Sequence, residues 1–224
     1  AAIAQSPTDW LTGVLEQAAP DSNVTGMPRG TLAPQENAEP VPVRMRARLT
    51  ADGEAIGQGL VWRVFGRTGD GEGRTNLIAT LEEATPTFKL KPGDYIVNAA
   101  LGRAHITRRV SVQPGNAEPA IEEFVLNAGG LRVAALVDGA EAPSNTVSYA
   151  VYSDRDQTDV RQLVLSSVRP GVVVRLNAGI YHIVSTYGDC NAVVSTDITV
   201  EAGKLTEAML THSAAKATFK LVQR

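Results

Sequence analysis

The sequence repeats itself at an interval of about 86 residues, and this repeat limits the possible folds more than any other feature. Lys89–Val97 corresponds to Arg175–Val184, and both contain the pattern Leu-x-x-Gly-x-Tyr. Further anchors keep the same order, with insertions and deletions of only a few residues. In chain order the paired anchors are Trp62 with Tyr149, Gly93 with Gly179, and Tyr95 with Tyr181. The sequence therefore predicts two copies of one structural unit.

Each copy breaks into short runs in which apolar and polar residues alternate, the pattern of half-buried antiparallel strands. Seven such runs occur in the first copy, at 43–49, 60–65, 76–81, 87–90, 95–101, 105–112 and 121–126. Seven short strands with a turn signal between them are typical of an immunoglobulin-like sandwich. We therefore predict an all-β fold of tandem immunoglobulin-like antiparallel β-sandwiches, over residues 43–127 and 128–213.

Residues 1–42 differ from the rest in composition. Ala2-Ile3-Ala4 has the small-x-small form that precedes a signal-peptidase cut, which predicts a signal-peptide remnant and an exported protein. A capping sequence at Ser6–Asp9 precedes apolar residues at helical spacing and predicts a short N-terminal helix. The rest is an acidic linker, and residues 1–42 carry five acids and one arginine, a net charge of −4. We expect the helix to pack on a sandwich or on a neighbouring subunit, because its apolar stripe is otherwise uncovered.

The last residues, 214–224, resemble the beginning of a further copy. Ala217–Val222 matches Leu131–Val137, which opens the second copy, again at an interval of 86. The segment is predicted to be the first strand of a third unit; the alternative is a strand that pairs with an existing sheet edge.

The repeated motif at Leu90–Tyr95 and Leu176–Tyr181 resembles that of carboxypeptidase-regulatory-like and related prealbumin-type or immunoglobulin-like modules. Asn191–Val194 and Glu201–Ala208 resemble secreted alphaproteobacterial repeat proteins. The resemblance covers about residues 43–224. It implies a β-sandwich in the periplasm or on the cell surface that acts as a spacer or binding module, and it implies no catalytic residues.

Three repeated pairs are predicted to be structural. They are Gly93 with Gly179, Tyr95 with Tyr181, and Trp62 with Tyr149. The glycines would supply a tight turn before a strand. The first tyrosine pair would cap the core with the hydroxyl bonded to backbone, as in a tyrosine corner. The remaining pair would fill the core between the sheets.

Arginines alternate along the first predicted strand and so share one face. Others lie near enough in the predicted topology to extend that face. The candidate binding patch consists of Arg44, Arg46, Arg48, Arg103, Arg108 and Arg109. Such a patch would bind an anionic glycan, the acidic N-terminal segment or a partner protein. The simpler interpretation is that these charges protect a strand edge from aggregation.

No arrangement of residues predicts a metal, a cofactor or a catalytic group. The loop Asp154–Asp159 could offer two or three oxygen ligands to calcium, but it lacks the glycine and distal glutamate of an EF-hand, so a solvated loop is favoured. The single cysteine, Cys190, would need a histidine base. The three histidines, at positions 105, 182 and 212, fall in separate predicted elements. We predict that the protein is not an enzyme.

Net charge and hydropathy exclude further classes of protein. A net charge of −3 and a pI of about 5.7 argue against nucleic acid as a partner. No apolar run approaches the roughly 20 residues needed to span a bilayer. The sequence predicts a non-catalytic, periplasmic or secreted cell-envelope protein that acts as a structural or binding module for an envelope protein or glycan. The alternative is an accessory module that binds carbohydrate or an envelope polymer. The oligomeric state stays open.

Overall fold

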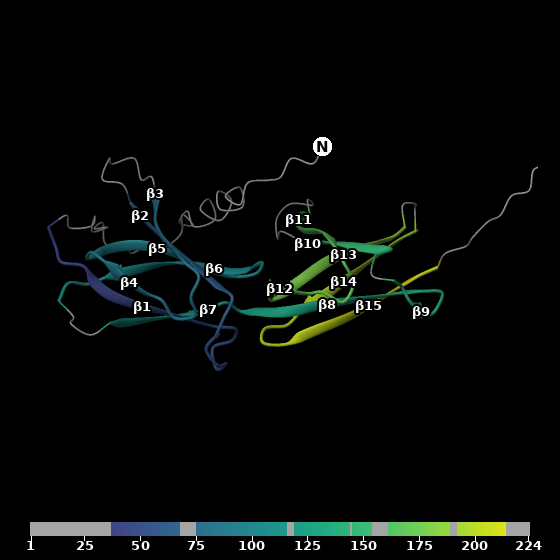
Figure 1. The fold of residues 1–224 in the computed structure, drawn as a ribbon, viewed down its shortest axis with the longest axis horizontal. Helices are drawn as coiled ribbons and strands as arrows, with labels where there is room; N and C mark the ends of the chain where they lie inside the picture. The colour runs from purple at the N-terminus through teal and green to yellow at the C-terminus, as the bar shows by residue number, and fades with distance from the viewer. Residues whose placement is uncertain are drawn as a thin grey trace, which may run out of the picture. The chain divides into compact units, whose positions relative to one another are not determined.

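The computed structural model describes residues 37–67, 75–115, 119–143, 145–153, 161–188 and 192–213. These residues form fifteen strands and no helix, so the predicted all-β fold is confirmed (Figure 1). They divide into two compact units. Unit 1 consists of residues 37–101 and 105–126, and unit 2 consists of residues 102–104 and 127–213.

The seven strands of the first half agree closely with the seven alternating runs of the sequence. They are β1 (Val41–Arg48), β2 (Leu60–Arg67), β3 (Thr75–Leu81), β4 (Thr87–Leu90), β5 (Gly93–Leu101), β6 (Ala104–Val112) and β7 (Ala120–Val125). They form a three-stranded sheet of order β4-β1-β7 and a four-stranded sheet of order β3-β2-β5-β6. Strand β1 runs antiparallel to β4 and parallel to β7.

The second half has the same strand order. Its strands are β8 (Ala128–Val137), β9 (Ala140–Glu141), β10 (Val147–Ser153), β11 (Gln162–Val168), β12 (Val173–Asn177), β13 (Gly179–Tyr187), β14 (Ala192–Val200) and β15 (Leu205–His212). The sheets are β12-β8-β15, with the short β9 also on β8, and β11-β10-β13-β14. Strands β8 and β15 are parallel, like β1 and β7.

This strand order differs from that of an immunoglobulin constant domain, in which the first and second strands belong to one sheet. Here the first strand of each unit pairs with the fourth and the last of its seven main strands. The sequence predicts only antiparallel pairing, whereas each unit contains one parallel pair, between its first and last strands. Alternation along a strand cannot reveal this difference, because it is the same in parallel and antiparallel neighbours.

In each unit the two sheets pack face to face around an apolar core. Trp62 of β2 meets Phe124 of β7 edge-on, with ring centroids 5.2 Å apart, and its indole N–H donates to the Glu83 carbonyl at 2.9 Å. Tyr149 of β10 lies at the corresponding place in unit 2 and is 1% exposed. The core around it contains Leu131, Val133, Val151, Leu176, Tyr181, Ile183, Val200 and Leu210. Residues from both sheets therefore build one core, which defines a sandwich.

The repeated glycines and tyrosines lie at equivalent places at the start of β5 and β13. The Tyr95 hydroxyl donates to the Lys91 carbonyl at 2.7 Å, and the Tyr181 hydroxyl donates to the Asn177 carbonyl at 3.0 Å. Burial raises the pKa of both tyrosines. Gly93 and Gly179 begin β5 and β13 with φ values of 153° and 159°, a conformation that side chains with a Cβ rarely adopt.

Several predicted features lie outside the described residues and stay predictions. They are the N-terminal helix, the acidic linker up to residue 36, the Asp154–Asp159 loop, Cys190 and the strand at Ala217–Val222.

Candidate functional site

The alternating arginines of β1 share the outer face of the sheet β4-β1-β7, and two of them pair with a carboxylate. The parallel register places Arg46 opposite Glu123 of β7. The Glu123 carboxylate lies 3.0 Å from the Arg46 guanidinium and 3.3 Å from that of Arg48. Arg48 also donates to the Gly53 carbonyl at 2.9 Å. Arg44 is exposed and is left without an ion pair among the described residues.

Arg108, on β6, contacts two residues of β7 in the other sheet of unit 1. Its guanidinium lies 2.6 Å from the Glu122 carboxylate and 4.1 Å from the centroid of the Phe124 ring. These contacts join β6 of one sheet to β7 of the other, at the edge of the sandwich. A cation–π contact of this kind contributes about 0.5–2 kcal/mol. Arg108 therefore stabilises the sandwich edge.

The six arginines do not form one surface. Arg103 lies in the turn between β5 and β6, and Arg109 is exposed on the outer face of the sheet opposite to that of Arg44. The sequence places the β1 arginines on one face correctly. It cannot place the remaining three, since their position depends on which sheet β6 joins and on which way each side chain points.

The strand register aligns the outer face of unit 2 with that of unit 1. Leu90 lies opposite Val41, and its repeat counterpart Leu176 lies opposite Gly129. This register aligns the outward residues of β1 with those of β8. Arg44 corresponds to Arg132, Arg46 to Ala134, and Arg48 to Leu136. The residue opposite Ala134 is Met209, where unit 1 has Glu123. An alanine and a methionine thus replace a paired arginine and glutamate.

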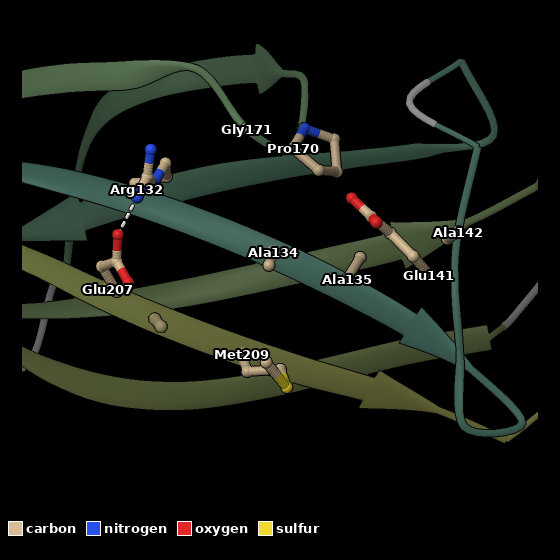
Figure 2. A pocket seen from close by; sticks show the side chains of 10 residues that line it. Arg132, Ala134, Ala135, Glu141, Ala142, Pro170, Gly171, Glu207 and Met209 are labelled. Atoms are coloured by element: carbon tan, nitrogen blue, oxygen red, sulfur yellow. Dashed lines mark hydrogen bonds and ion pairs between the residues drawn. The ribbon is translucent and has the colours of Figure 1, made fainter.

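A groove with a volume of about 550 Å³ occupies this face of unit 2 (Figure 2). We call it the Met209 groove; it is lined mainly by Arg132, Ala134, Glu141, Pro170, Glu207 and Met209. It lies beside the edge of β8, between the end of the pairing with β12 and the start of the pairing with β9. Two backbone hydrogen bonds flank it. The Gly171 N–H donates to the Val133 carbonyl at 2.8 Å, and the Ala142 N–H donates to the Ala135 carbonyl at 2.9 Å.

The groove combines charge with exposed apolar surface. The guanidinium of Arg132 pairs with the carboxylate of Glu207 at one end, while Glu141 extends its carboxylate into the groove from the other side (Figure 2). Glu141 is exposed and has no ion pair with any described residue. Met209 is 67% exposed. Sequence reasoning missed this site; the available signal was that two of the three β1 arginines, Arg46 and Arg48, are replaced by Ala134 and Leu136 in β8.

A second surface lies on the outer face of the sheet β11-β10-β13-β14. Tyr152, His182 and Asp197 lie side by side on three adjacent strands. The Nδ1 atom of His182 is 2.6 Å from the Asp197 carboxylate, and the guanidinium of Arg161 is 3.9 Å from the same oxygen. The ring centroids of Tyr152 and His182 are 6.5 Å apart. The row presents an aromatic ring beside polar groups.

The histidines are not brought together. His105 belongs to β6, and His182 lies on the outer face of its sheet. His212 is fully buried, and its Nε2 lies 2.9 Å from the Oγ of Ser185, which is also fully buried. This serine–histidine pair has no access for a substrate. Within the described ranges no group of three or more histidine, cysteine or acidic residues could hold a metal ion.

Comparisons with known proteins give a limited likeness. No family model and no curated protein matches the chain. The minor pilin GBS52 of Streptococcus agalactiae is 14% identical, with a TM-score of 0.38, over 82% of this chain and 100% of that chain. A C-terminal fragment of the pilus adhesin SpaC from Lactobacillus rhamnosus GG is 10% identical, with a TM-score of 0.29, over 81% and 100%. Over the residues described here, no helix long and apolar enough to cross a membrane is found.

Proposed function

We propose that this chain is a non-catalytic, exported cell-envelope protein that acts as a binding module, and that the Met209 groove binds a partner protein. The observation that carries this proposal is the 67% exposure of Met209 on a face where unit 1 has ion pairs. Methionine is enriched at protein interfaces, where its flexible thioether adapts to a partner. Met209 is more exposed than Ile121, which is 52% exposed on the equivalent strand of unit 1, and it borders a groove.

The identical strand order of the two units supports a tandem repeat whose copies have different roles. In unit 1 the outer face is closed by ion pairs between β1 and β7. In unit 2 the corresponding face carries the groove. The Ala2-Ile3-Ala4 tripeptide supports export to the periplasm or the exterior.

A site-specific photo-crosslink tests the binding function. A benzophenone amino acid at Met209 of the full chain should form a discrete adduct in envelope extract, and the partner is then identified by mass spectrometry. The matched control carries the same group at Ile121, which is 52% exposed on the equivalent strand of unit 1. Equal adducts from both positions, or none from Met209, would contradict the proposal. Cell fractionation of the native protein tests export.

The second candidate function is carbohydrate or envelope-polymer binding, and the row of Tyr152, His182 and Asp197 favours it. Aromatic rings with adjacent hydrogen-bonding groups on an open face are the elements that a sugar ring needs. A glycan array with the full chain tests this candidate. Binding that Tyr152→Ala removes and Met209→Ala leaves unchanged would favour the second surface over the groove.

A further inference from the structure

We infer that the Met209 groove receives a basic side chain, a lysine or an arginine, of its protein partner. This inference rests on the proposed function and adds the chemistry of recognition. It is carried by three features of the groove: its charge, its apolar floor, and the residue that unit 1 has at the same place.

The charge of the groove favours a cation. The guanidinium of Arg132 is already paired with the carboxylate of Glu207. Glu141 is left as an exposed carboxylate with no ion pair among the described residues. The Arg132–Glu207 pair is neutral as a whole, so the net charge of the groove comes from Glu141, which repels an incoming carboxylate. An incoming ammonium or guanidinium would give Glu141 a counter-ion.

The floor and size of the groove suit the aliphatic part of such a side chain. On the outer face Ala134 lines it with a methyl group, and Met209 borders it with a long apolar side chain. Lysine and arginine bury their methylene stems against apolar surface while the charged end stays near solvent. With a volume of about 550 Å³, the groove has room for such a side chain.

Unit 1 has an ion pair at the corresponding place on its outer face. At the place of Ala134 it has Arg46, whose guanidinium lies 3.0 Å from the carboxylate of Glu123 on the last strand. In unit 2 both members of that pair are replaced, by Ala134 and Met209, and the carboxylate at the rim comes instead from Glu141 of β9. A partner's lysine or arginine would therefore form, with Glu141, an ion pair on the face where unit 1 has one of its own.

The test uses the methyl resonances of methionine in the full chain, which contains only Met27, Met45 and Met209. Labelled protein is titrated with N-acetyl-lysine methylamide and with N-acetyl-arginine methylamide. The neutral norleucine and the acidic glutamate derivatives serve as matched probes. We expect a saturable shift of the Met209 resonance with the basic probes and a weaker one with the others. Met45 is fully buried in unit 1 and serves as an internal reference.

Binding of the lysine probe to two variants tests which carboxylate pairs with its ammonium group. Glu141→Gln should weaken binding of the lysine probe roughly threefold, as expected for an exposed charge pair. The control Glu201→Gln makes the same change of charge at a residue that pairs with Lys204 outside the groove, and it should leave binding unchanged. Equal binding of norleucine and lysine, equal effects of the two variants, or no Met209 shift with either basic probe would overturn the inference.

The two experiments fail separately. If the Met209 crosslink forms while the basic probes do not bind, the groove is an interface of different chemistry and only this inference falls. If the basic probes bind while Met209 forms no specific adduct, the recognition chemistry stands and the proposed function in the envelope falls.

Discussion

The hydroxyl of Tyr149 is predicted to destabilise unit 2. The side chain is 1% exposed, and its hydroxyl oxygen is buried without a hydrogen-bond partner. Burial raises the pKa of this tyrosine to about 12. A buried hydroxyl that has lost its bond to water and gained none from protein costs about 1–3 kcal/mol. We therefore expect Tyr149→Phe, which keeps the ring and removes the hydroxyl, to stabilise the protein by about 1 kcal/mol.

Calorimetry of the full chain measures this effect. For a domain of 60–100 residues, 1 kcal/mol corresponds to a change of about 4–8 °C in melting temperature. The matched control is Tyr181→Phe in the same core, which removes a hydroxyl that donates to the Asn177 carbonyl at 3.0 Å. That variant should lose about 0.5–1.5 kcal/mol. If Tyr149→Phe destabilises unit 2 as much as Tyr181→Phe does, the hydroxyl has a bonding partner and the reasoning is refuted.

Four further predictions concern high pH, Arg108, calcium and the N-terminal segment. Between pH 10 and 12 the wild type should lose stability more steeply than Tyr149→Phe, because unfolded tyrosine releases its proton near pH 10 whereas Tyr149 keeps its proton up to about pH 12; denaturant titrations across this range measure the difference. Arg108→Lys should lower stability by about 1 kcal/mol in urea unfolding, because lysine cannot lie flat on Phe124, and an unchanged midpoint would contradict the stacking. Calcium should leave the melting temperature unchanged if the 154–159 loop is only solvated; a ligand at 100 times its Kd would add about 2.7 kcal/mol. Deletion of residues 5–20 should lower the melting temperature, and high salt should barely reproduce the effect, because the expected contact is mainly apolar.

The strands could be predicted from sequence because their signal is local. The alternation of Val43, Met45 and Ala47 with arginines specifies one buried and one outer face, and the structure has that arrangement. The repeat likewise identifies Tyr95 and Tyr181 as equivalent positions, since each hydroxyl bonds to the carbonyl four residues earlier.

The sites could not be predicted because they depend on contacts between distant residues. Glu123 neutralises arginines of β1 only because β7 lies beside β1. Arg48 and Glu123 are 75 residues apart in the sequence. The Met209 groove likewise requires β15 beside β8, as well as the change of partner along β8 from β12 to β9. No periodicity in a single strand encodes either arrangement. A comparison of aligned repeats, position by position, could have singled out Ala134.

The parallel pairing of the first and last strands has a mechanical consequence. When the two ends of a unit are pulled apart, tension acts on the start of the first strand and the end of the last, in opposite directions along the strands. The hydrogen bonds between the first and last strands are then loaded simultaneously, in shear, and do not break one after another. Unit 1 has six residue pairs in this contact, from Val43 with Ala120 to Arg48 with Val125, and unit 2 has eight. This pairing therefore raises the force needed to unfold each sandwich, and unit 2 should unfold at a higher force than unit 1.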